Sequence, residues 1–206
     1  MSVGMLVLTA LAVLIFFGVL QRVLDRMYLT DRQALAVAAA MFVGTLLPNI
    51  SLGPVALNIG GAVIPLVVCA YLFLRADTYL EVWRTLLGSF LTGVAVFGLS
   101  LALPSEPEQL MMDPMWLYAI CAGVLAWLLG RSRRGAFICG VLGVLMADTA
   151  TATANWSRGI AQQLVLGGAG VADAVVVSGV LAVLLCELIG EVAERLVRGR
   201  RKEGAS

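Results

Sequence analysis

The stretch that decides the fold is residues 139–190, CGVLGVLMADTATATANWSRGIAQQLVLGGAGVADAVVVSGVLAVLLCELIG. It contains two apolar segments joined by a short polar loop, with Asp148 before the loop and Asp173 after it. Carboxylates within segments long enough to span a bilayer are costly, and they usually mark a functional site. The rest of the sequence indicates which other groups lie near these two aspartates.

The composition excludes an ordinary soluble domain. Of the 206 residues, 61% are hydrophobic and 13% are charged, whereas soluble domains average about 45–50% and about 25%. The apolar excess extends along the whole chain, so we predict an all-α, polytopic transmembrane helical bundle in the cell membrane. The net charge of +1 gives no reason to expect a nucleic-acid partner. The expected partner is the lipid bilayer.

Residue types that hold metals and cofactors are scarce. The chain has no histidine, which removes histidine-based catalytic triads and histidine-ligated zinc or haem. The four cysteines lie in apolar segments and form no CxxC pair, so we interpret them as small buried hydrophobes. We therefore expect no metal centre and no cofactor.

Seven apolar segments can be drawn, each near the roughly 20 residues that a transmembrane helix needs. They are residues 3–20, 33–48, 55–74, 82–103, 115–130, 136–154 and 164–189. The first has its basic residues after the apolar run, so we interpret it as a retained span. We predict a single transmembrane domain over residues 1–194 and a basic cytoplasmic tail over residues 195–206.

The basic residues alternate between loops. The odd-numbered loops and the tail carry 13 Lys and Arg residues, and the even-numbered loops carry one, Arg158. By the positive-inside rule, the N-terminus lies outside and the C-terminus inside. The alternation also supports seven spans, because one span more or fewer would disturb it.

The third segment is irregular, and it reads GPVALNIGGAVIPLVV over residues 53–68. Proline and paired glycines weaken a helix, so we predict a broken helix between Asn58 and Pro65. Transporters build binding sites at such breaks. The alternative is a simple kink in which Asn58 hydrogen-bonds to a neighbouring helix.

Each aspartate has a structural and a functional interpretation. Asp173 follows the glycine-rich residues 167–170, and it can cap the helix that begins there. Asp148 lies near the C-terminal end of its segment, where the helix dipole disfavours an anion. It can pair with Arg158; otherwise it is protonated, binds a cation or works together with Asp173.

The predicted topology brings these features to one side. The two aspartates flank one outer loop and Asn58 follows another, so we expect a polar site in the outer half of the bundle. The candidate catalytic residues are Asp148 and Asp173. The candidate substrate-binding residues are Asn58, Gly60, Gly61, Asp148, Thr149, Gly168, Gly170 and Asp173.

Three segments resemble a known family, the membrane proteins grouped as domain of unknown function 1614. They are NIGGAVIP at residues 58–65, the dipeptide Ala147-Asp148, and GGAGVAD at residues 167–173. The family has an aspartate before a GGAG-x-x-D element at about this distance. The threonines after Asp148 depart from the family, which more often has apolar residues there. The resemblance implies a polytopic membrane protein and no established activity.

Three functions are compatible with the sequence, and we favour a non-enzymatic one. The first is binding or transport of a small solute or cation, for which a homodimer is a candidate assembly. The second is an intramembrane aspartyl protease using Asp148 and Asp173. Similar enzymes have a Gly-x-Gly-Asp element, whereas here the glycines lie two residues further from Asp173 and no Pro-Ala-Leu element follows. The third is a non-catalytic assembly or scaffold protein, in which the two aspartates would occupy separate, satisfied places.

Overall fold

The protein is a helical bundle, as the sequence predicted. A computed structural model describes residues 30–103 and 114–203, and the first predicted span, residues 3–20, lies outside them. The described helices are α3 (Asp31–Leu46), α4 (Ile64–Leu74), α5 (Tyr79–Ala102), α6 (Pro114–Gly130), α7 (Arg133–Ser157) and α8 (Ala174–Glu203). The described strands are β1 (Ile50–Leu52), β2 (Val55–Leu57) and β3 (Leu164–Leu166).

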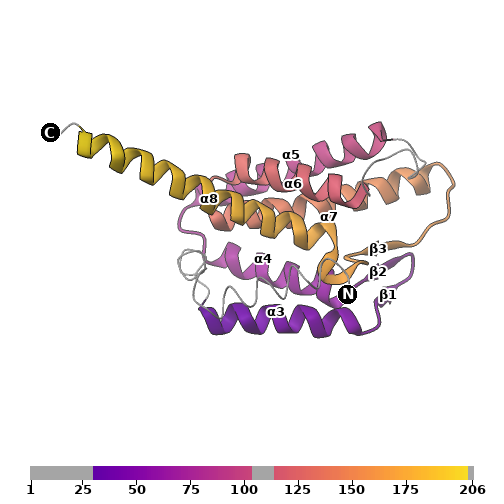
Figure 1. The fold of residues 1–206 in the computed structure, drawn as a ribbon. Helices are drawn as coiled ribbons and strands as arrows, with labels where there is room; N and C mark the ends of the chain where they lie inside the picture. The colour runs from indigo at the N-terminus through magenta and orange to yellow at the C-terminus, as the bar shows by residue number, and fades with distance from the viewer. Residues whose placement is uncertain (1–29, 104–113, 204–206) are drawn as a thin grey trace.

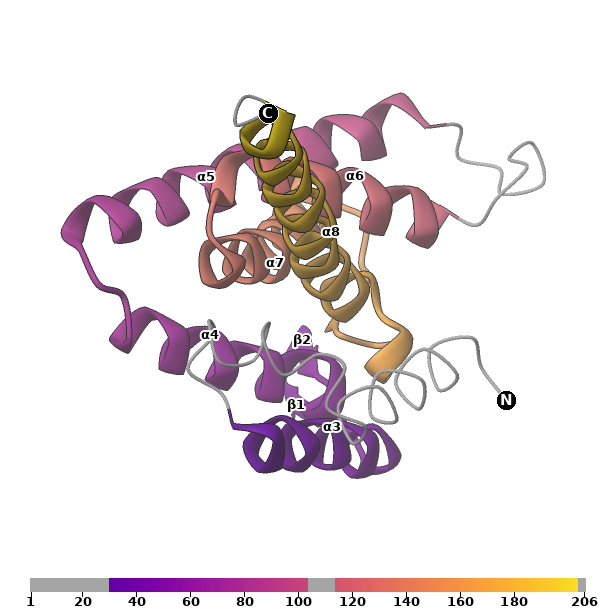
Figure 2. The same ribbon diagram turned by 60° about the vertical axis from the view of Figure 1, so that its left-hand side comes forward.

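Helix α7 is the centre of the bundle. It contacts α5, α6 and α8, and these four helices form one part of the bundle. Helices α3 and α4 form a second part, on the opposite side of α7 from α5 and α6 (Figures 1 and 2). Small residues allow this close packing. A Cβ atom added at Gly143 would lie 2.6 Å from the Thr92 side chain on α5, and one at Gly140 would lie 2.9 Å from the backbone of Gly179 on α8.

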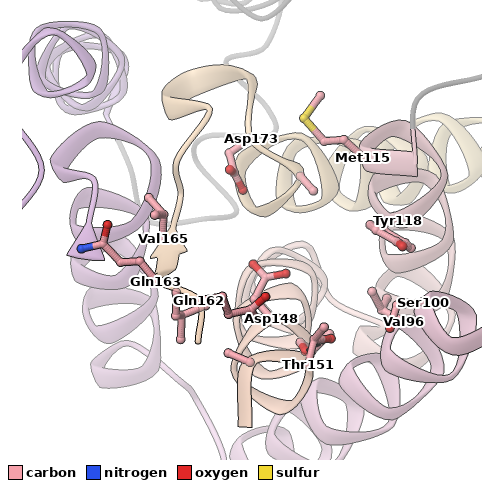
Figure 3. Close-up of a pocket in the computed structure, with 14 residues that line it drawn as sticks. Val96, Ser100, Met115, Tyr118, Asp148, Thr151, Gln162, Gln163, Val165 and Asp173 are labelled. Atoms are coloured by element: carbon pink, nitrogen blue, oxygen red, sulfur yellow. Dashed lines mark hydrogen bonds between the residues drawn. The ribbon is translucent and has the colours of Figure 1, made fainter. Parts of the chain in front are cut away.

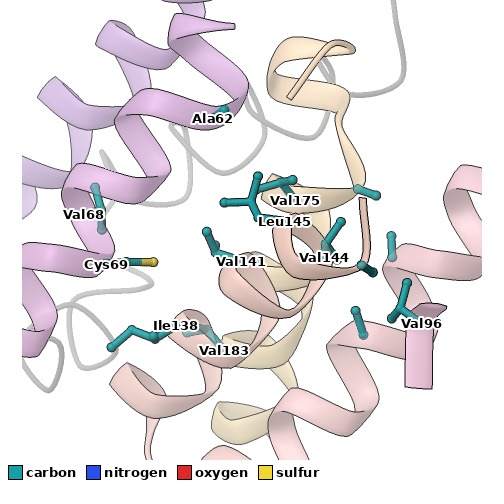
Figure 4. Close-up of a cluster of buried hydrophobic side chains, with 14 of the residues drawn as sticks. Ala62, Val68, Cys69, Val96, Ile138, Val141, Val144, Leu145, Val175 and Val183 are labelled. Atoms are coloured by element: carbon teal, nitrogen blue, oxygen red, sulfur yellow. The ribbon is translucent and has the colours of Figure 1, made fainter. Parts of the chain in front are cut away.

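The apolar core surrounds the middle of α7. Val141 and Val144 are almost completely buried there, and Val175 at the start of α8 contributes to the same cluster. In Figure 4, Val68 and Cys69 on α4 lie on the side of Val141, and the same cluster continues to Val144 and Val175. The core therefore joins the two layers and holds the first turn of α8 against α7.

The three-stranded sheet is a departure from the expected all-α fold. Strands β1 and β2 form a hairpin with Gly53 (φ +66) in its turn, and β2 pairs in parallel with β3. The predicted apolar segments 55–74 and 164–189 therefore both begin as strands, which was not predicted from the sequence. Their backbones pair with each other, and the Asn58 N–H extends the pairing by donating to the Leu166 carbonyl at 3.0 Å.

The interruption of the third segment is a π-helical turn, Ile59–Val63. The Asn58 carbonyl accepts hydrogen bonds from both Ala62 and Val63, at 3.0 and 3.1 Å. Pro65 lies in the first turn of α4, where its missing N–H is tolerated. Helical structure thus runs without a gap from Ile59 through Pro65 to Leu74, and the predicted break is instead a change from strand to π-helix at Asn58.

Two helices in the described part of the chain, α5 and α7, are long and apolar enough to cross a bilayer, with 24 and 25 residues. The apolar parts of the other described helices are shorter: α6 has 17 residues, and the apolar part of α8 is Ala174–Gly190. By length and composition alone, these two helices are compatible with a membrane protein. The seven spans and their orientation stay predictions.

Charged side chains gather at the end of the bundle where α7 begins. Arg134 forms ion pairs with Asp77 and with Glu81, the latter at 3.1 Å. Arg133 donates from Nε to a Glu187 carboxylate oxygen at 2.6 Å. We call these five residues the charged network. Asp148 lies 14 residues further along α7, roughly 20 Å away at about 1.5 Å per residue.

Candidate functional site

A pocket of about 360 Å³ lies where α7, the first turn of α8 and β3 meet α5 and α6 (Figure 3). It contains both of the aspartates that the sequence singled out. Its walls combine apolar, hydroxyl, amide and carboxylate groups. The lining residues are Val96, Ser100, Met115, Tyr118, Ala147, Asp148, Thr151, Ala152, Gln162, Gln163, Leu164, Val165, Asp173 and Ala174.

Asp148 is the carboxylate with freedom to bind a ligand. It projects from α7 into the pocket and is partly buried (Figure 3). Within the described residues it takes part in no ion pair, and no hydrogen bond from another residue reaches its carboxylate. The other acidic side chain in the pocket lining is that of Asp173, which offers no counterion. The structure thus places an uncompensated carboxylate on the pocket wall.

Asp173 has a structural role as well as a place in the pocket. One of its carboxylate oxygens accepts a hydrogen bond from the Val175 N–H at 3.0 Å, and the other accepts from the Ala169 N–H at 3.1 Å. The first bond caps the N-terminus of α8, as the structural interpretation proposed. The second fixes the glycine-rich loop before it. Asp173 is therefore held in one orientation, facing Asp148 across the pocket (Figure 3).

Basic side chains are missing from this pocket. None of its lining residues is Lys or Arg. The alternative partner for Asp148, Arg158, is exposed and forms no ion pair with it in the described chain. Two carboxyl groups therefore face one cavity, and no Lys or Arg among the lining residues pairs with them.

Several pocket residues were not predicted. Tyr118 and Met115 come from α6, Ser100 comes from α5, and Gln162 precedes β3. Gln162 is held by its backbone carbonyl, which accepts a hydrogen bond from the Trp156 indole N–H at 2.9 Å. Thr151 is three residues after Asp148, a spacing that puts both on the same face of a helix. For Thr151, this spacing was the one indication in the sequence that the residue lies beside Asp148.

Asn58 lies outside the pocket and organises the backbone around the π-helical turn. Its side-chain oxygen accepts from the Gly61 N–H at 2.9 Å, and its side-chain nitrogen donates to Asn49 at 2.9 Å. It is 4% exposed. Its polar atoms are engaged by the protein, so it acts as a support.

The predicted glycines also serve as supports. A Cβ atom at Gly61 would lie 2.3 Å from the Gly167 carbonyl and 2.6 Å from the Gly170 carbonyl. We call this meeting of Gly61, Gly167 and Gly170 the glycine contact. Gly60 lies equally close to the backbone of α3, at Met41. The contact fixes the loop that carries Asp173 against the π-helical turn, and so holds one wall of the pocket.

The two remaining predicted residues, Thr149 and Gly168, are not among those that line the pocket. Thr149 is exposed, and its hydroxyl donates to the Leu145 carbonyl at 2.7 Å within α7. Gly168 is exposed beside Val165. Of the eight predicted binding residues, the structure brings Asp148 and Asp173 together in the pocket, and it places the others around the supporting loop or on the surface.

Comparison with known proteins agrees with the resemblance noted from the sequence. Residues 15–185 match a family model described as "Protein of unknown function (DUF1614)". All three segments that carry the resemblance fall within this match. No curated protein and no solved structure matches the chain.

Proposed function

Because the chain belongs to the DUF1614 family, whose description states no activity, we propose its function from the pocket: it is a membrane protein that binds and transports a small solute or cation. The observation that carries the proposal is the pair of carboxylates, Asp148 and Asp173, in one cavity without a basic lining residue. A cation bound there would compensate charges that the lining residues leave uncompensated. Carboxylates of this kind mark ion and substrate pathways in membrane proteins.

The outer surface of α5 supports a membrane location. Trp83, Leu87 and Phe90 are 69%, 59% and 55% exposed. Contiguous exposed apolar side chains usually mark a surface that contacts lipid or another protein. In the proposed topology the charged network lies on the cytoplasmic side. The pocket, at the other end of α7, then lies in the outer half of the bilayer.

The alternative functions receive less support. Two catalytic carboxyls of an aspartyl protease share a proton, but no hydrogen bond joins Asp148 to Asp173, and both Asp173 oxygens accept from backbone N–H groups. A scaffold in which the aspartates occupy separate places does not explain why they line one cavity. Ligand binding accounts for both observations.

We expect Asp148→Asn and Asp173→Asn each to abolish cation binding. The measurement is thermal unfolding of the full chain in detergent with Na⁺, K⁺, Ca²⁺, Mg²⁺ or methylammonium, since a ligand at 100 times its Kd stabilises by about 2.7 kcal/mol. At least one of these cations should raise the Tm of the wild type and leave both variants unchanged. Without ligand, Asp173→Asn should also cost about 1 kcal/mol of stability, because it loses the acceptor for the Ala169 N–H.

The matched control is Glu187→Gln, which removes one carboxylate from the charged network at the other end of the bundle. It should retain the cation response of the wild type. Equal responses in the wild type and in both aspartate variants would remove the proposal.

A further inference from the structure

We propose that the ligand of the pocket is a small organic cation, a protonated amine with a short apolar body, whose ammonium group binds to Asp148. The inference rests on the proposed function and names the class of ligand. It follows from the way charge, apolar surface and volume are distributed over the pocket.

Of the two carboxyl groups in the pocket, that of Asp148 is the one available to a ligand. Asp173 is already committed to the backbone N–H groups of Ala169 and Val175, whereas Asp148 has no such partner in the described chain. The pocket thus offers one carboxyl group without a protein partner in the described chain, and a second, fixed carboxyl group faces it. This arrangement suits a single ammonium group, whose three N–H donors can bond a carboxylate and nearby hydroxyl or amide oxygens.

The described residues offer no site with several carboxylates for a divalent metal ion. A Ca²⁺ site surrounds the ion with about 6–8 oxygens at about 2.3–2.6 Å, and the described residues contain no group of three His, Cys, Asp or Glu side chains arranged to hold a metal. The cavity volume, about 360 Å³, lies instead within the range of roughly 300–1,000 Å³ typical of small-molecule sites. The space exceeds what a bare ion needs.

The rest of the wall suits an apolar body next to a cation. Val96, Met115 and Leu164 supply apolar surface. Tyr118 lines the same pocket as Asp148 (Figure 3), so one ligand can contact both. An aromatic ring attracts a cation through its face. Carboxylate, aromatic ring and apolar wall together match an alkylammonium ion.

The test is a series of n-alkylammonium ions from methyl to hexyl, compared with Na⁺, K⁺ and Ca²⁺ at constant ionic strength. Binding is measured by calorimetry on the full chain in detergent. Affinity should rise about fourfold for each added CH₂, equivalent to about 0.8 kcal/mol, until the pocket is full. Asp148→Asn should lower the affinity at least tenfold, and Glu187→Gln should leave it unchanged.

A second variant tests the pocket without changing its charge. Thr151 lines the cavity one turn after Asp148, so Thr151→Leu should reduce the available length and shift the best-binding chain to a shorter one. This result remains informative if Asp148→Asn fails to fold.

Each of the following results would overturn the inference. If an inorganic cation binds through Asp148 and no alkylammonium ion does, the inference fails and the proposed function stands. If butanol binds as tightly as butylammonium, or if alkylammonium affinity is the same in Asp148→Asn, the ammonium group is not what the site recognises. If no cation in the series binds, the inference and the cation-binding function fail together.

Discussion

Replacing Gly61 with alanine is expected to destabilise the protein by about 3 kcal/mol or more, at the upper end of the cost of overpacking. The added Cβ atom would lie 2.3 Å from the Gly167 carbonyl and 2.6 Å from that of Gly170. Both are backbone atoms, so no rotation of a side chain can make room. The loop that carries Asp173 would have to move away from the π-helical turn.

The measurement is chemical denaturation of the variant in detergent beside a matched control, Gly98→Ala. A Cβ atom at Gly98 meets nothing within 4 Å, and this glycine lies within α5. The control should be as stable as the wild type or slightly more stable, because alanine favours a helix over glycine by about 1 kcal/mol. A Gly61→Ala protein as stable as the control would show that the glycine contact does not hold the loop.

Replacing Arg134 with leucine is expected to cost about 3–5 kcal/mol, the usual effect of breaking a buried ion pair by removing one partner. The Arg134 side chain is 10% exposed and that of Glu81 is 13% exposed. Arg134 also donates to the Arg75 carbonyl at 2.6 Å. Without Arg134, the largely buried Glu81 carboxylate has no counterion. The segment between α4 and α5 also loses its contacts with α7, which Arg134 makes through the Arg75 carbonyl and Asp77.

The matched control is Arg158→Leu. This arginine is exposed and forms no ion pair within the described part of the chain, so its loss should change stability by less than about 0.5 kcal/mol. In the double variant Arg134→Leu/Glu81→Leu, part of the lost stability should return, because the stranded carboxylate is gone. Equal Tm values for the Arg134 and Arg158 variants would contradict this account of the charged network.

The helices could be predicted because each is encoded locally. The apolar segments at residues 82–103, 115–130 and 136–154 correspond to α5, α6 and α7 within a few residues at each end. A continuous apolar segment of this length can be recognised as a helix without knowing which other segments pack against it. The predictions of a helical bundle and of membership in the DUF1614 family are both confirmed. Each could be made from short segments of sequence, without knowledge of the tertiary contacts.

The sheet could not be predicted in the same way. Strands β2 and β3 contain three residues each and pair across more than a hundred residues of sequence, with Val55 opposite Leu164. Three apolar residues carry no periodicity that distinguishes a strand from a helix. Their conformation is decided by the partner strand, and only the folded chain supplies that partner.

The site was predicted in part. Asp148 and Asp173 stood out because carboxylates are costly in apolar segments, and both line the pocket. Tyr118 and Met115 depend on how α6 packs beside α7, which no local pattern records. Asn58 and Gly61 were grouped with the aspartates by their expected depth. The structure places them behind the wall, where close backbone contact requires glycine.

The most direct test of the central claim is labelling of Thr151→Cys with a membrane-impermeant maleimide. The four native cysteines are replaced by alanine, Asp148 is kept, and right-side-out and inverted vesicles are compared with and without butylammonium. Thr151→Cys is expected to be labelled from the outside, and butylammonium should slow the labelling. Thr153→Cys, which does not line the pocket, should be labelled at the same rate with or without butylammonium. Labelling of Thr151→Cys only from the cytoplasmic side, or at a rate that butylammonium does not change, would contradict a cation site in the outer half of the bundle.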